Sequence, residues 1–128
     1  RAAGRTVVAA AGNAASCRTF WPAAFPGVVA VGALGCSGPA WFTNHGPWVD
    51  ACAPGVDVVS TFFIDAPGAA TTGWASWSGT SFAAPKVAAA IAAEMCRTGS
   101  TAAAAEAAVL RSPGLFRLPD LGVVVNLD

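Results

Sequence analysis

The chain has 128 residues, of which 55% are hydrophobic, and its seven basic side chains balance seven acidic ones. This length fits one domain with one apolar core, and the lack of a charge excess argues against nucleic acid as a partner. The richest apolar run, VAAAIAAEMC at 87–96, is interrupted by Glu94, so no stretch approaches the roughly 20 residues of a membrane span. We therefore expect a soluble domain. Because Arg1 is no initiator methionine and no signal-like segment follows it, we also expect an internal or C-terminal piece of a longer protein.

Short apolar runs bounded by Gly, Pro and Asn predict the strands. They are apolar at every position, which is typical of strands covered on both faces, as in a parallel sheet. The predicted strands are RTVVAAAGN at 5–13, PGVVAVGALG at 26–35, WVDACAP at 48–54, VDVVST at 56–61 and LGVVVNLD at 121–128. Between Phe62 and Trp77, turn residues and aromatics follow no period, so we expect a loop.

Two helices are predicted in the second half of the chain. The spacing of Ala and Ile in SFAAPKVAAAIAAEMCRTG, at 81–99, indicates a helix that Gly99 ends. Pro85 lies past the position that proline prefers, so we expect a distorted first turn. A second helix, STAAAAEAAVLRS at 100–112, has Ser100 or Thr101 as its cap and Pro113 after its end. Strands and helices together predict an α/β fold with a mainly parallel sheet flanked by helices.

The four cysteines, Cys17, Cys36, Cys52 and Cys96, form no Cys-x-x-Cys pair, and the one histidine, His45, lies far in sequence from any two of them, so we expect no zinc site. Their even number fits two disulfides in a secreted protein, and the alternative is a set of small buried thiols. Cys17 and Cys36 each follow a predicted strand. If those strands are parallel neighbours, both sulfurs lie at one sheet edge, so Cys17–Cys36 is the predicted pair.

The segment GTSFAAP at 79–85 raises the question of whether Ser81 is more than a helix cap. A Thr80 or Ser81 hydroxyl before a helix ordinarily caps it, which is worth about 1 kcal/mol. However, Gly79 permits a sharp turn and close approach of another chain, and Asn13 ends a buried strand with an amide donor. Carboxyl ends of parallel strands and amino ends of helices share one rim of the sheet, so Asn13 and Ser81 should converge. There a serine hydroxyl can attack a carbonyl while the Ser81 N–H and the Asn13 amide stabilise the oxyanion.

Four blocks, in order, are similar to the C-terminal half of the subtilisin-like serine proteases. They are VVAAAGN, PGVVAVGAL, FTNHGPWVDACAPGVDVVST and SGTSFAAPKVAAAIAA, and the similarity covers roughly Thr6 to Ala93. The Gly-Thr-Ser-x-Ala-x-Pro segment is among the more diagnostic short motifs in protease families. The resemblance implies that residues 1–128 are the C-terminal half of a three-layer α/β peptidase domain.

The resemblance also implies roles for individual residues. Ser81 corresponds to the nucleophile and Asn13 to the oxyanion-hole side chain, with Gly79 and Thr80 assigned to substrate binding beside them. One wall of the primary specificity pocket, whose backbone pairs with the substrate as an added strand, is expected at Ala10, Ala11 and Gly12.

Phe20 or Trp21 falls where the family places the base and far wall of that pocket, and a bulky Phe20 would make the pocket shallow. Ordinary core or loop packing is the alternative for both. Asp50 matches a position that in some members helps to bind a cation, so a structural calcium is possible but not assigned, and no other cofactor is expected. Lys86 stands where a non-catalytic histidine is common.

The general base and its orienting carboxylate are absent from the matching blocks. The resemblance implies that an N-terminal half supplies this Asp and His, and that His45 is a solvated loop residue. We therefore expect a serine endopeptidase of peptides or proteins, secreted and, from its Ala- and Gly-rich composition, bacterial. An inert pseudoprotease, a peptide-binding module and one subunit of a two-chain protease remain open. Another serine hydrolase is the weaker alternative, because Ser81 lacks the Gly-x-Ser-x-Gly setting.

Overall fold

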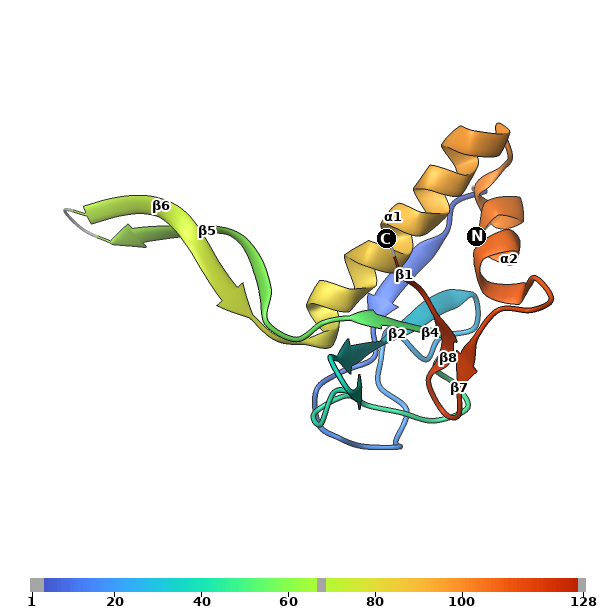
Figure 1. Ribbon diagram of the computed structural model, residues 1–128, viewed down its shortest axis with the longest axis horizontal. Coiled ribbons are helices and arrows are strands. Elements are labelled where there is room, and N and C mark those ends of the chain that lie inside the picture. The colour runs from blue at the N-terminus through green and yellow to red at the C-terminus, as the bar shows by residue number, and fades with distance from the viewer. Residues whose placement is uncertain (1–3, 67–68, 127–128) are drawn as a thin grey trace.

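The computed structural model describes residues 4–66 and 69–126 and places a mainly parallel sheet beside two helices (Figure 1). Four strands pair in parallel, in the order β1 (Val7–Ala10), β2 (Val28–Gly35), β4 (Ala51–Pro54) and β8 (Gly122–Val124). Two short strands pair antiparallel, β3 (Gly38–Pro39) with β2 and β7 (Arg117–Leu118) with β8. The helices are α1 (Thr80–Thr98) and α2 (Ala102–Arg111). The predicted α/β class is confirmed.

The sheet has an apolar core on each face, as expected for strands without polar alternation. The larger core joins the sheet to both helices and includes Val29, Val31, Ala53, Val87, Ile91 and Ala105. The smaller core lies on the other face and includes Ala11, Cys52 and Leu121, with Trp48 packed against them. Within the described residues, therefore, both helices lie on one face and loops cover the other. Gly32 has no room for a side chain, because a Cβ there would come within 2.6 Å of the Leu121 side chain.

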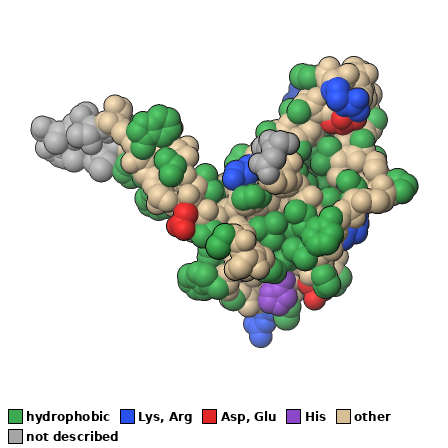
Figure 2. Space-filling view, viewed as in Figure 1, with side chains coloured by type: hydrophobic (Ala, Val, Ile, Leu, Met, Phe, Trp, Pro, Cys, Tyr) green, Lys and Arg blue, Asp and Glu red, His purple; other side chains and the backbone are tan. Residues whose placement is uncertain are grey.

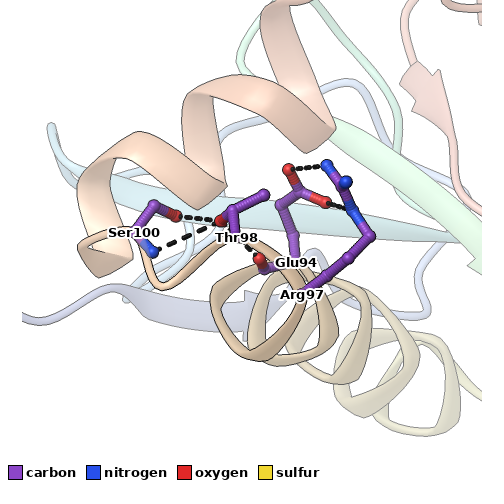
Figure 3. A network of polar contacts seen from close by, with 4 residues as sticks. All are labelled: Glu94, Arg97, Thr98 and Ser100. Carbon is purple, nitrogen blue, oxygen red and sulfur yellow. Dashed lines mark hydrogen bonds and ion pairs between the residues drawn. The ribbon is translucent and has the colours of Figure 1, made fainter.

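Helix α1 ends where the sequence predicts. Gly99 adopts a left-handed conformation with φ 66°, and its N–H donates to the Met95 carbonyl. In the same turn the Thr98 hydroxyl donates to the Glu94 carbonyl and accepts the Ser100 N–H (Figure 3). A hydrogen bond from Arg97 lowers the pKa of Glu94. The helix runs through Pro85 without interruption, and neither helix in the described part of the chain is long and apolar enough to cross a membrane.

The prediction of a loop between Phe62 and Trp77 is wrong. Strands β5 (Val58–Ala66) and β6 (Ala69–Trp77) form a separate two-stranded antiparallel sheet, which projects from the body of the molecule (Figure 1). Of the predicted strand 56–61, residues 58–61 belong to β5 of this hairpin, and none belongs to the main sheet. Apolar residues occur on both faces of the hairpin, so they leave no simple alternation in the sequence.

The predicted Cys17–Cys36 disulfide is also wrong, because all four cysteines are free thiols. The reasoning failed at Cys17. Strand β1 ends at Ala10, and Cys17 lies in the long loop that follows, while Cys36 lies in the turn between β2 and β3. The two thiols therefore do not share a strand end.

The four thiols should differ in reactivity. Burial of Cys52 raises the pKa of its thiol from 9.0 to about 11, so little thiolate forms at pH 8, and the side chain is also shielded. Cys17, Cys36 and Cys96 are exposed. We expect Ellman's reagent to modify these three in the native protein at pH 8, and Cys52 only after denaturation. Thiols that appear only after reduction would contradict this arrangement.

Candidate active site

Asn13 and Ser81 lie on different elements that meet at the carboxyl edge of the sheet. Asn13 is in the loop after β1, and Ser81 is exposed in the first turn of α1. Thr80, which is buried, joins them: its N–H and its hydroxyl each donate to Asn13 Oδ1, both at 2.9 Å. The Thr80 hydroxyl in turn accepts the Gly12 N–H at 3.2 Å. The predicted convergence of strand end and helix start is thus observed.

These bonds answer the question of the helix cap. The N-cap of α1 is Gly79, which has no side chain, and neither Thr80 nor Ser81 caps its own helix. Instead, Asn13 accepts the first N–H of the helix from outside. Neither the hydroxyl nor the N–H of Ser81 bonds to any described residue. Both groups of Ser81 therefore remain available to a ligand.

The amide of Asn13 is oriented by the same contacts. Because Oδ1 accepts two hydrogen bonds, Nδ2 is the end left to donate. This nitrogen lies 3.4 Å from the position that a Cβ on Gly79 would occupy. It is therefore close to Gly79, two residues before Ser81. The Asn13 amide therefore lies in contact with the turn that precedes the candidate nucleophile.

Sequence reasoning missed Asn44, which holds the loop that carries Asn13. Its side chain is 2% exposed, and its Nδ2 donates to the Ala11 carbonyl at 2.8 Å. Its Oδ1 accepts the N–H of Ala14 at 2.9 Å and that of Ser16 at 3.2 Å. Its own N–H donates to the Gly12 carbonyl at 2.9 Å. In the sequence, an asparagine in FTNHG indicates only a turn, and no local signal predicts these long-range bonds.

The backbone of the predicted specificity wall is already hydrogen-bonded within the protein. The Ala11 N–H donates to the Val31 carbonyl, the Gly12 N–H donates to Thr80, and Asn44 occupies both carbonyls. Ala10 pairs with Val31 in the β1–β2 ladder. Strand-like pairing of a substrate with this segment stays a prediction, and the second lone pair of each carbonyl is what it could use.

The two aromatic residues predicted for the pocket, Phe20 and Trp21, contact different parts of the structure. Phe20 lies against Gly12, since its ring comes within 3.2 Å of the position of a Cβ there. Trp21 packs on Phe25, with ring centroids 4.5 Å apart. Both are about half exposed. Phe20 is thus the aromatic residue that the fold brings to the segment before Asn13.

A small apolar hollow of about 220 Å³ adjoins the start of α1. It lies between the foot of the β5–β6 hairpin and the helix, and its lining residues are Ser60, Thr61, Phe62, Ala75, Trp77 and Phe82. Phe82 is the neighbour of Ser81, and the rings of Phe62 and Trp77 stack with centroids 5.8 Å apart. The hollow can therefore accept an apolar group close to the serine.

Asp50 lies in a cavity that carboxylates and guanidinium groups share. Its Oδ2 accepts the Ala30 N–H at 2.9 Å, and the guanidinium groups of Arg111 and Arg117 line the same cavity of about 290 Å³. Glu106 lines this cavity too, with an oxygen 3.8 Å from the Arg111 guanidinium, so two carboxylates and two guanidinium groups balance in charge. Across residues 4–66 and 69–126, no three His, Cys, Asp or Glu side chains cluster in a way that could hold a metal.

His45 follows Asn44 in the loop between β3 and β4. It is half-buried, and its backbone N–H donates to the Ser16 carbonyl. It lines a separate cavity with Trp41 and Leu121. No described contact joins it to Ser81.

An exposed serine in the first turn of a helix, at the carboxyl edge of a parallel sheet and beside an oriented amide, defines a site suited to nucleophilic chemistry. A model of the subtilase family, peptidase S8, matches residues 1–112, and the chain therefore belongs to this family. The family predicted from the four sequence blocks is confirmed.

Individual relatives are similar over most of this chain. The thermophilic serine proteinase of Bacillus sp. strain AK1 is 50% identical over 88 residues, which are 66% of this chain and 20% of that protein. An extracellular protease of Xanthomonas campestris pv. campestris is 40% identical over 91 residues, or 70% of this chain and 16% of its own. The solved structure of the prenylagaramide maturation protease PagA superposes with a TM-score of 0.74 at 27% identity, covering 97% of this chain and 48% of that one. The chain thus spans less than half the length of each of these relatives.

Asn44 gives the first test of the site's architecture. Asn44→Ala would remove the part-buried bonds to the N–H groups of Ala14 and Ser16 and the buried bond to the Ala11 carbonyl, so we expect the free energy of unfolding of the complete protein to fall by about 3 kcal/mol in urea titrations. Asn44→Asp is the matched control, because it keeps both acceptor bonds and loses only the donor to Ala11. Its free energy of unfolding should lie between those of the parent protein and Asn44→Ala. An alanine variant as stable as the parent protein would contradict the assigned contacts.

Proposed function

We propose that this chain is the nucleophile-bearing, C-terminal half of the catalytic domain of a serine endopeptidase. The observation that carries the proposal is the orientation of Asn13: Thr80 holds its Oδ1, so its Nδ2 stays a donor beside the unpaired N–H of Ser81. Two such donors next to an exposed hydroxyl suit the oxyanion that forms in acyl transfer. Membership of the subtilase family and the serine proteinase of Bacillus sp. strain AK1 support the same reaction.

In the proposed mechanism, Ser81 Oγ adds to the carbonyl carbon of a peptide bond and its proton passes to a histidine imidazole. The carbonyl π electrons move to oxygen, where Asn13 Nδ2 and the Ser81 N–H stabilise the negative charge. As the intermediate collapses, the C–N bond breaks, and the imidazolium protonates the leaving amine. Water then attacks the carbonyl carbon of the acyl-serine and gives its proton to the imidazole. The imidazolium protonates Ser81 Oγ as the bond from this oxygen to the acyl carbon breaks, and the acid product leaves. Each step uses only side-chain and backbone groups, so we propose no cofactor.

The histidine and its orienting aspartate belong, in this proposal, to an N-terminal half of the domain. The fraction of each relative that this chain covers, between 16% and 48%, leaves room for such a half. Among the described residues His45 makes no contact with Ser81, so we assign it no role in catalysis. A chain that pairs with a second polypeptide carrying the two residues would work by the same chemistry.

Substrate recognition is proposed at the segments that border Ser81. Ala10, Ala11 and Gly12 would form one wall of the pocket for the side chain before the cleaved bond, and Phe20 against Gly12 would make that pocket shallow. Trp21 would contribute to its far rim, while Gly79 and Thr80 bring the substrate close to the nucleophile. Export from a bacterial cell is proposed by analogy with the relative named as an extracellular protease.

A second candidate function is an inert peptide-binding protein. One observation favours it: among the described residues, no imidazole bonds to the Ser81 hydroxyl. The two candidates differ in whether Ser81 becomes nucleophilic when the rest of the protein is present.

Labelling by a fluorophosphonate probe separates these candidates. In the complete protein we expect Ser81 to be labelled and Ser81→Ala to abolish labelling without loss of the fold. The 128-residue chain by itself should label weakly, because it lacks the base, and addition of the upstream half should restore labelling. His45→Ala should change neither result. Loss of labelling in His45→Ala would make His45 the base, and an unreactive Ser81 in the complete protein would favour the binding function.

Asn13 can be tested by steady-state kinetics of the complete enzyme. Asn13→Ala should lower kcat by about 10²- to 10³-fold with little change in KM, which is the loss known for the corresponding oxyanion donor of subtilisin itself. Asn13→Asp is the matched control, since it keeps the acceptor for Thr80 but removes the donor, and it should also lose kcat. A loss confined to KM would mean that Asn13 binds only the ground-state substrate.

A further inference from the structure

The β5–β6 hairpin, here called the arm, pairs with no third strand among the described residues. In the described part of the chain it forms a sheet of two strands only, so the outer edges of β5 and β6 both face solvent (Figure 1). A hairpin of two strands is marginally stable in water unless something packs on it. An unpaired edge also offers a row of N–H and C=O groups to any extended chain.

The described side chains of the arm are uncharged, and many of them are apolar. Residues 58–63 and 72–77 include no charged side chain, and hydrophobic groups cover much of the arm in Figure 2. The strand register places Val59, Phe63 and Trp74 on one face, where they are 65%, 60% and 75% exposed. This face, the outer face of the arm, therefore presents apolar groups that ordinarily mark an interaction surface.

A hollow of about 490 Å³ lies among these side chains. Its lining residues are Thr61, Phe62, Phe63, Thr72, Gly73 and Trp74. Gly73 contributes no side chain, and a Cβ added there would meet nothing within 4 Å. Phe62 and Gly73 pair with each other on the face opposite Phe63 and Trp74, so the lining comes from both faces of the arm. On the outer face the rings of Phe63 and Trp74 border the hollow, which suits an aromatic or branched aliphatic group.

The foot of the arm is tied to the helix that carries Ser81. The Gly79 N–H donates to the Gly55 carbonyl at 2.8 Å, and the Asp57 N–H donates to the Ser78 hydroxyl at 2.9 Å. Strand β6 ends at Trp77, and the chain passes through this fixed turn directly to Ser81. A peptide that lies along the arm is thus led to the candidate nucleophile.

We propose that the arm is a docking site for an extended, uncharged and apolar segment of the polypeptide substrate, at a distance from the bond that is cleaved. Backbone pairing with an open strand edge would hold the segment irrespective of its sequence, and the hollow beside Trp74 would select an apolar side chain. The continuity of the arm with the turn before Ser81 favours a substrate over a second copy of this chain. The proposal rests on the proposed endopeptidase function.

The test compares a long and a short substrate of the complete enzyme. β-Casein, an unfolded polypeptide, can reach the arm, whereas a tripeptide p-nitroanilide cannot. Trp74→Ser and Phe63→Ser should lower the ratio of kcat/KM for casein to that for the tripeptide by about tenfold, the loss typical of an aromatic anchor, and Trp74→Phe should restore most of it. Trp41→Ser is the matched control, because Trp41 is 86% exposed and lies elsewhere.

A binding measurement keeps this test independent of catalysis. With Ser81→Ala, the Kd of fluorescein-labelled casein, measured by anisotropy, should rise about tenfold on Trp74→Ser and stay constant on Trp41→Ser. If casein binding depends on Trp74 but Ser81 is unreactive, the arm proposal stands and the endopeptidase function fails. If Ser81 reacts but neither the ratio nor the Kd changes, the arm proposal is overturned. A Trp74→Ser variant that only converts dimers into monomers would assign the arm to a second copy and likewise overturn it.

Discussion

The site depends on the pair of hydrogen bonds from Thr80 to Asn13 Oδ1. These bonds close the gap between the carboxyl end of β1 and the amino end of α1, two elements that are 67 positions apart in the chain at these residues. They also decide which end of the Asn13 amide is left to donate. A helix whose N-cap is a glycine would otherwise begin without a side-chain acceptor, so the same contact serves the fold and the proposed chemistry.

Asn44 supports this contact from the other side. It holds the backbone on both sides of Asn13 through Ala11, Gly12, Ala14 and Ser16, and it does so while buried. The nucleophile and both proposed oxyanion donors are thus arranged within this chain alone. The general base is the part of the machinery that this proposal assigns to the other half of the domain.

Sequence reasoning predicted the main sheet and the meeting of Asn13 with the Ser81 helix, because buried parallel strands and the shared rim of an α/β sheet follow from local patterns. The hairpin was missed because Phe62, Phe63 and Trp74 expose apolar groups on both faces, which hides the alternation of a strand. The disulfide prediction failed because Cys17 lies well beyond the end of β1. Asn44 could not be predicted, since its partners are about 30 residues distant and each bond depends on the finished fold.

The central claim is that Asn13 Nδ2 and the Ser81 N–H form an oxyanion site around a Ser81 nucleophile. The most direct measurement is a crystal structure of the complete protein with a peptidyl boronic acid, whose tetrahedral boronate stands for the intermediate of acyl transfer. The account predicts a bond from Ser81 Oγ to boron, with one boronate oxygen about 2.7–3.1 Å from both donors. A boronate that leaves Ser81 unmodified, or whose oxygens turn away from Asn13, would contradict it.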